Sequence, residues 1–398
     1  MAERPSSAAR LETAFSRRSA VEPRPFLGLI DAVIVPGVSG YDFDGAILEA
    51  HAQGVWVWMV RDIASDLIRD DLTDTPDGRA ALDKLVPALI QRAREATTNL
   101  LPEQERRVRV QMGGDDTFRR LPFVLQALKC RGLYDKARAF GRATAGMPDE
   151  AALGLALQSM PLNDRPVCAL LMQAAMAEIA HPGRVMAAAI RIAGASEEQA
   201  VARAGLGTLV DAMLAHAQAQ IPALQQYGAF ADIDMVCTSV ERFHKLIRAV
   251  TSYMELGRMT RWSGTVAGLI KTVSELLEPK LREVLPDVNL ALRRHHGTDW
   301  LDTDQVLAAL NGCYILNTVR DCRDSLALNA LFDQMWTQVG QALDIHVNRN
   351  LELFRQNPSD RVTGDRLDAA IKMAELRFNG EYAEVLRRAR DGAERRAG

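Results

Sequence analysis

The sequence predicts an all-α protein, with stacked, solenoid-like αα-hairpins in the N-terminal half followed by a bundle of longer helices. From about residue 44 to residue 390 the chain reads as successive helical segments with almost no alternating strand pattern. Of the 16 prolines, all but Pro222, Pro279, Pro286 and Pro358 lie within the first 182 residues. Because an interior proline removes a helical hydrogen bond and clashes with the preceding turn, we expect short helices upstream and long helices downstream.

Length and composition bound the class of protein. The 398 residues allow two or three domains, and a net charge of −3 gives no electrostatic reason to expect nucleic acid. The five cysteines are scattered and never spaced as Cys-x-x-Cys, so we expect reduced thiols. We find no apolar run long enough for an integral membrane segment and no secretory signal. The arginine- and alanine-rich composition is typical of a high-GC bacterial genome, and we expect a cytoplasmic protein.

The predicted domain organisation has four parts. Residues 1–25 are rich in Ser, Ala, Arg and Pro and are expected to form a disordered tail. Residues 26–221 are expected to form the short-helix αα-hairpin domain, and residues 222–390 the long-helix bundle. Residues 391–398 form a basic tail.

The first half is expected to consist of short elements. β-Branched residues cluster over 26–40, which predicts one short strand or an extended lead-in. Apolar periodicity then predicts helices, which are separated by Asp-Gly, Gly-Gly and Arg-Gly turns. The expected helices cover 45–69, 78–99, 103–112 and 115–130.

One segment has the turn chemistry of a helix hairpin. Residues 121–148 contain Gly132, Tyr134, Ala137 and a closing Pro148, and they resemble one hairpin of the tetratricopeptide kind. A similar fragment occurs at 378–390. Because the hairpin does not recur at a fixed period, the sequence predicts αα-hairpins without membership of that family.

The later helices lengthen along the chain. Paired helices are predicted over 149–160, 164–181, 183–194 and 196–219. After Pro222, apolar residues from Val236 to Met254 recur at spacings of three and four, as in a helical bundle. Asp302 to Asp304 predict an N-cap, and Asn357-Pro358 predict the end of that long stretch. A break near 325–329 divides the stretch into two helices.

An aspartate cluster offers the first candidate site. Asp70, Asp71 and Asp74 have the form D-D-x-x-D, which resembles the magnesium-binding motif of class I terpene and prenyl-diphosphate enzymes. The resemblance implies that the carboxylates hold Mg²⁺ against a diphosphate. Such enzymes need a second metal motif, and none is found here. The favoured interpretation is therefore an acidic helix end that runs into a loop.

Two Glu-x-x-His units offer the second candidate site. Glu178 with His181, and Glu241 with His244, have the i, i+3 spacing that places a carboxylate and an imidazole on one helical face. Four such ligands can hold a di-iron or di-manganese centre. His181 precedes Pro182 and so sits at a helix end, and two such units are unsurprising by chance. The favoured expectation is therefore that no metal is bound.

Two further fragments imitate functional motifs. Residues 202–210 imitate a DNA-binding helix-turn-helix, but no Lys or Arg falls between 204 and 218, so DNA binding is not expected. Residues 37–41 miss the nucleophile-elbow pattern because Tyr41 replaces its second glycine.

Trp56 and Trp58 lie about 200° apart around a helix and are expected not to face one core together. One of them is therefore exposed or covered by another element, and both are candidates for a partner or self-association surface.

The function predicted from these observations is a non-enzymatic helical scaffold or adaptor that acts through protein–protein interaction. Stacked helical hairpins make extended binding surfaces, whereas no set of chemical residues converges in the sequence. The alternative is a metal-dependent all-α enzyme that uses either Fe or Mn at the Glu-x-x-His pair or Mg at the aspartate cluster. Neither the partner nor homo-oligomerisation is fixed by the sequence.

Overall fold

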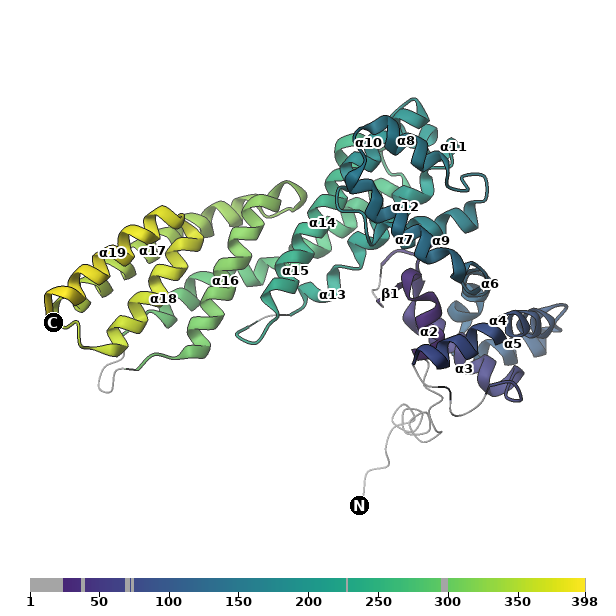
Figure 1. The fold of residues 1–398 in the computed structure, drawn as a ribbon, viewed down its shortest axis with the longest axis horizontal. Helices are drawn as coiled ribbons and strands as arrows, with labels where there is room; N and C mark the ends of the chain where they lie inside the picture. The colour runs from purple at the N-terminus through teal and green to yellow at the C-terminus, as the bar shows by residue number, and fades with distance from the viewer. Residues whose placement is uncertain are drawn as a thin grey trace, which may run out of the picture. The chain divides into compact units, whose positions relative to one another are not determined.

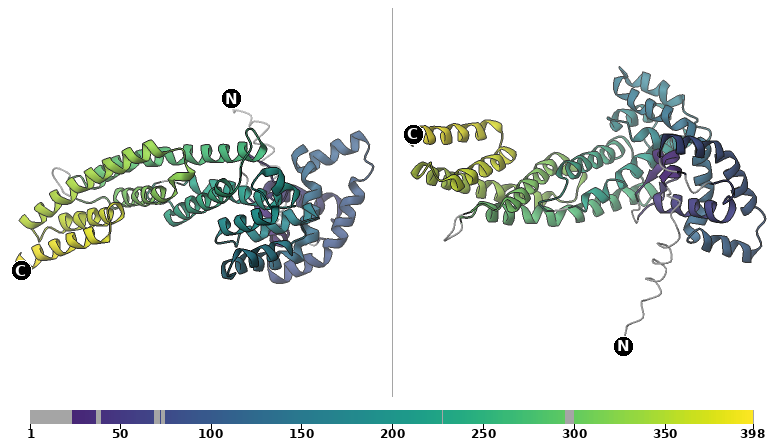
Figure 2. Two further views of the ribbon diagram at one scale, coloured as in Figure 1. Left: turned by 90° about the horizontal axis from the view of Figure 1, so that it is seen from above. Right: turned by 60° about the horizontal axis from the view of Figure 1, so that its bottom comes forward.

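The chain is all-α, as predicted. The structure, a computed structural model, describes residues 24–36, 40–68, 72, 75–226, 228–294 and 300–397. Helices make up most of this part of the chain (Figures 1 and 2). The chain divides into two compact units, residues 1–215 and 216–398. Each unit is described by itself.

The first unit is a succession of short elements. A two-stranded parallel sheet pairs Ile34 with Ile47 and Val35 with Leu48. Its first strand lies in the segment 26–40, where a strand or extended lead-in was expected. Its second strand lies in 45–69, where a helix was predicted, and the helix there begins only at Glu49. The remaining elements are helical, and the last of them, α12, contains the boundary between the units. In order they are α2 (Arg24–Ile30), η1 (Asp31–Val33), β1 (Ile34–Val35), β2 (Ile47–Leu48), α3 (Glu49–Trp58), η2 (Met59–Ile63), α4 (Pro76–Thr97), α5 (Pro102–Gln111), α6 (Asp115–Cys130), η3 (Arg131–Leu133), α7 (Tyr134–Ala143), η4 (Thr144–Gly146), α8 (Glu150–Gln158), α9 (Arg165–Met176), α10 (Pro182–Ala193), α11 (Glu198–Arg203) and α12 (Gly207–Gln218).

In the first unit, two of the main helix pairs join a helix to the next but one along the chain. The turn predicted at Arg131-Gly132 is present as η3, and the Tyr134 hydroxyl donates across it to the Ala127 carbonyl at 3.0 Å. However, α7 packs mainly against α9, and α8 against α10. The helix predicted over 196–219 is two helices, because Gly205 adopts a φ of +76° between them. Solenoid-like stacking stays a prediction.

The second unit contains the longer helices. Its elements are α13 (Ile221–Leu224), α14 (Ile233–Tyr253), α15 (Arg261–Ala291), α16 (Thr303–Cys322), η5 (Arg323–Ser325), α17 (Asn329–Gln356), α18 (Arg361–Arg377) and α19 (Gly380–Ala397). Helix α15 packs against α16 and α17, α14 against α16, and α17 against α18. The core of this unit is therefore built between long helices, as the apolar spacing predicted.

Local signals set several boundaries in the second unit. The predicted N-cap is confirmed, since the Asp302 carboxylate accepts hydrogen bonds from the backbone N–H groups of Asp304 at 3.0 Å and Gln305 at 3.3 Å. Helix α17 ends directly before Asn357-Pro358, also as predicted. The predicted break is present as η5 and the turn after it. These boundaries depend on residues within one helical turn.

Four prolines lie inside helices, which corrects the expectation that helices begin or end near proline. They are Pro87 of α4, Pro122 of α6, and Pro279 and Pro286 of α15. At Pro87 the compensation is visible. Proline cannot donate to the carbonyl four residues earlier, and the Arg131 guanidinium donates to that carbonyl, on Asp83, at 3.2 Å. The same guanidinium pairs with the Asp83 carboxylate.

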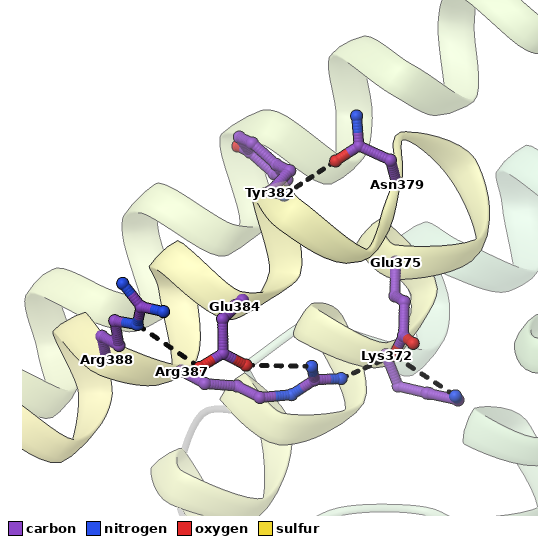
Figure 3. A network of polar contacts seen from close by, with 7 residues as sticks. All are labelled: Lys372, Glu375, Asn379, Tyr382, Glu384, Arg387 and Arg388. Carbon is purple, nitrogen blue, oxygen red and sulfur yellow. Dashed lines mark hydrogen bonds and ion pairs between the residues drawn. The ribbon is translucent and has the colours of Figure 1, made fainter.

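Charged side chains join the last two helices. Glu375 of α18 accepts a hydrogen bond from Arg387 of α19 at 2.5 Å and from Lys372 at 3.3 Å (Figure 3). These bonds, above all the one from Arg387, lower the pKa of the Glu375 carboxyl. Asn379 starts α19 by accepting a hydrogen bond from the Tyr382 backbone N–H at 2.8 Å. The α18–α19 turn is thus set by a cap and an ion-pair network.

Candidate functional site

The two predicted metal sites differ in what the structure describes. Asp70, Asp71 and Asp74 lie outside the described residues. Glu178 is half-buried and forms an ion pair with Arg142 at 3.3 Å. His181 is exposed directly before α10. The Glu178 carboxylate therefore already has a cationic partner.

The second Glu-x-x-His motif, Glu241 with His244, lies on α14 in the second compact unit of the chain. Glu241 is exposed, whereas His244 is half-buried with its Nδ1 atom 3.0 Å from the Ser325 hydroxyl. The pKa of His244 is lowered, mainly because the imidazole is partly buried. Within the described parts of the chain, no three His, Cys, Asp or Glu side chains are grouped to hold a metal ion. The Fe and Mn hypotheses gain no support from the described residues, whereas the Mg hypothesis concerns aspartates outside them.

The cysteines are poorly suited to nucleophilic chemistry. All five are free, and burial raises the pKa of each thiol. For Cys313 and Cys322 the pKa rises to about 12. A catalytic cysteine needs the opposite shift, because the thiolate is the nucleophile.

Trp56 and Trp58 are both buried, which corrects the prediction that they cannot face one core together. Helix α3 packs against α6 and against α2, so two sides of the helix are covered. Phe26 of α2 stacks on Trp56 with ring centroids 4.9 Å apart. Both tryptophans belong to the same hydrophobic cluster, with exposures of 0% and 2%. Neither side chain presents a surface to a partner in this fold.

A loop of the second unit exposes a different aromatic side chain. Phe230 lies between α13 and α14 and is 86% exposed. The backbone just before it is held by two buried polar side chains from neighbouring helices. Lys280 of α15 donates to the Gln226 carbonyl, and Asn311 of α16 donates to the Gly228 carbonyl at 3.1 Å. The exposed ring is therefore carried by a loop with fixed anchor points.

Helices α14 and α16 run alongside each other in the same direction. Cys237 of α14 forms a hydrogen bond with Thr318 of α16, and His244 lies beside Ser325, just after α16. Residue numbers therefore increase in the same direction along both helices. The start of α14, together with the loop that precedes it, therefore lies beside the middle of α16.

This arrangement gathers exposed apolar groups around Asn311. Leu307 and Tyr314 lie four residues before and three residues after Asn311, so they share its face of α16. Both are partly exposed, at 41% and 36%. We call Phe230, Leu307 and Tyr314, with the flanking Asp234 and Asp304, the Phe230 surface.

Acidic residues lie within four positions of this apolar patch on both helices. Asp234 lies in the first turn of α14 and Asp304 in the first turn of α16, and both are exposed. Within the described residues neither carboxylate has an ion-pair partner. The sequence marked Asp304 only as part of a helix start and gave no signal at Asp234. It could not reveal that buried Lys280 and Asn311 hold the loop.

Comparisons with protein-family models, with curated proteins and with solved structures returned no match.

Proposed function

We propose that the protein is a non-enzymatic helical adaptor that binds a protein partner through the Phe230 surface. The observation that carries the proposal is the exposed Phe230 ring on an anchored loop. Full burial of a phenylalanine side chain is worth about 1.5–3 kcal/mol, so this ring is a ready source of binding energy. Aromatic side chains of this kind commonly dominate the energy of an interface.

The chemistry of the surface defines the partner. The apolar centre fits a hydrophobic socket, and the exposed carboxylates of Asp234 and Asp304 fit a basic border around it. We therefore assign a protein partner with an apolar socket that is bordered by Lys or Arg. The raised thiol pKa values of Cys313 and Cys322 argue against cysteine-based catalysis.

We also place this adaptor in the bacterial cytoplasm. All five cysteines are free, which suits a reducing compartment. Among the described helices, none combines the length and apolar character needed to cross a membrane.

The test begins with a photo-crosslinking amino acid at position 230 of the full chain in cells. The crosslinked protein is identified, purified and titrated against the wild type, Phe230→Ala and Ile345→Ala. Ile345 is a matched control, since it is 65% exposed on α17 and lies outside the Phe230 surface. We expect Phe230→Ala to weaken binding about 30-fold and Ile345→Ala to leave it unchanged.

The proposal fails if Phe230→Ala binds the crosslinked partner as tightly as the wild type does. If crosslinks form only between two copies of this chain, the proposed partner is wrong and the surface mediates self-association. Charge reversal of Asp234 and Asp304 to Lys tests the basic border. It should slow association and remove part of its salt dependence.

A further inference from the structure

A polar pocket in the first unit is separate from the Phe230 surface. Its volume is about 450 Å³, within the range of small-molecule sites. The loop before β2, the start of α3 and the first half of α6 line it. The lining residues are Gly40, Tyr41, Asp42, Leu48, His51, Asp116, Arg119, Arg120 and Phe123.

Arg120 is the more buried of the two arginines that line the pocket. Its side chain is only 13% exposed, and its Nη2 atom lies 2.7 Å from the Asp42 carboxylate. The guanidinium also lies over the Phe123 ring, 5.2 Å from the centroid. A guanidinium carries five N–H donors, and Asp42 is its one ion-pair partner within the described residues. Donors therefore remain for a ligand in the pocket.

Two further groups add donors beside Arg120. Arg119 forms an ion pair with Asp116, one turn before it on α6. His51 faces Arg120, Asp42 and Asp116, and its pKa is lowered, first by burial and then by Arg120. An anion placed beside Arg120 and His51 would offset the charge of Arg120. It would thereby favour a protonated His51 as a further donor.

The loop that supplies Asp42 is fixed against α9. Gly45 lies so close to this helix that an added Cβ would be 2.2 Å from the Ala169 carbonyl oxygen. Phe43 is buried, and Asp44 pairs with Arg165 of α9 at 3.1 Å. The pocket wall is thus held in place without a ligand, which lowers the entropic cost of binding.

We propose that this pocket binds a small ligand through an oxyanion group, a phosphate or a carboxylate, held by Arg120 with His51 beside it. Planar guanidinium groups match both kinds of oxyanion. Leu48, Tyr41 and Phe123 form the apolar wall against which the body of the ligand packs. The shared chemistry is an oxyanion on a small, partly apolar molecule.

The test is calorimetric titration of the full chain with sulfate and, separately, with benzoate in a constant chloride background. Sulfate stands in for a phosphate group and benzoate for a carboxylate, and neither changes its protonation near neutral pH. Saturable binding of sulfate alone assigns a phosphate-bearing ligand, and saturable binding of benzoate alone assigns a carboxylate-bearing one. Binding of neither anion would overturn the proposal.

Three variants locate the binding. Arg120→Gln should weaken it at least about tenfold. The control Arg138→Gln removes an arginine of α7 that pairs with Asp31 outside the pocket, and it should leave binding unchanged. Wild-type affinity should rise as the pH falls below neutrality, and His51→Gln should abolish that rise. Equal affinity of wild type and Arg120→Gln, or an unchanged pH profile in His51→Gln, would overturn the assignment.

Discussion

Replacing Gly141 by Ala tests the close contact between α7 and α9. Gly141 lies in the last turn of α7, and its backbone does not adopt a positive φ. An added Cβ would lie 2.3 Å from the Ala175 carbonyl oxygen and 2.9 Å from the Glu178 Cβ. The first of these neighbours is backbone in α9 and cannot rotate away. The glycine is therefore what lets the two helices approach.

The expected loss of stability combines two opposing effects. Within a helix, alanine is favoured over glycine by up to about 1 kcal/mol. Restoring an ordinary contact requires α7 and α9 to separate by about 1 Å, and overpacking of this kind costs about 1–3 kcal/mol. Because the clash involves backbone, we place it at the upper end of that range. Gly141→Ala should therefore lower the free energy of unfolding by about 1–2 kcal/mol.

The assay is urea unfolding of the full chain, with Gly154→Ala as the matched control. Gly154 is also helical, on α8, but an added Cβ would meet only the Ile192 side chain at 3.9 Å, which is an ordinary contact. Gly154→Ala should leave the free energy of unfolding unchanged or raise it by up to about 1 kcal/mol. If Gly141→Ala proves as stable as Gly154→Ala, the reasoning from close approach is refuted.

Three other predictions concern single side chains of the second unit. Arg377 lies 3.8 Å from the Trp336 ring centroid and donates from Nε to the Trp336 carbonyl at 2.7 Å, so Arg377→Lys should lower the free energy of unfolding by about 1–2 kcal/mol in urea titrations. Because the folded pKa of His244 is lowered, the unfolded state binds more protons just below the ordinary value of 6.5. Unfolding free energy should therefore fall as the pH drops through that window, and His244→Gln should flatten the slope. With pKa values of about 12, Cys313 and Cys322 should react with a thiol reagent at neutral pH only after urea unfolds the chain.

Features set by neighbouring residues could be predicted from the sequence, whereas features set by distant residues could not. The N-cap at Asp302 and the end of α17 before Pro358 depend on a few adjacent residues, and both predictions were confirmed. The helix through Pro87 depends on Arg131, which is 44 positions away along the chain and replaces the lost hydrogen bond. No local pattern reveals such a donor. The proline rule therefore failed at Pro87 because of a residue distant in the sequence.

The candidate surface was missed for the same reason. Aromatic residues drew attention to Trp56 and Trp58, but periodicity describes one helix and not the elements that cover it. Phe230 carries no local signal, since a phenylalanine near Gly228 is ordinary in a loop. Its role depends on Asn311, which is 81 positions away and fixes the backbone before it.

The two proposed binding activities should respond to different changes in solution, which allows them to be separated in one intact chain. Partner binding at the Phe230 surface uses the exposed carboxylates of Asp234 and Asp304, so it should weaken as salt is added. Binding in the Arg120 pocket should strengthen on acidification, because His51 gains a proton beside the anion. Phe230→Ala should change only the first response, and His51→Gln only the second. A variant that changed both would show that the two sites are coupled, since these substitutions lie in separate units of the chain.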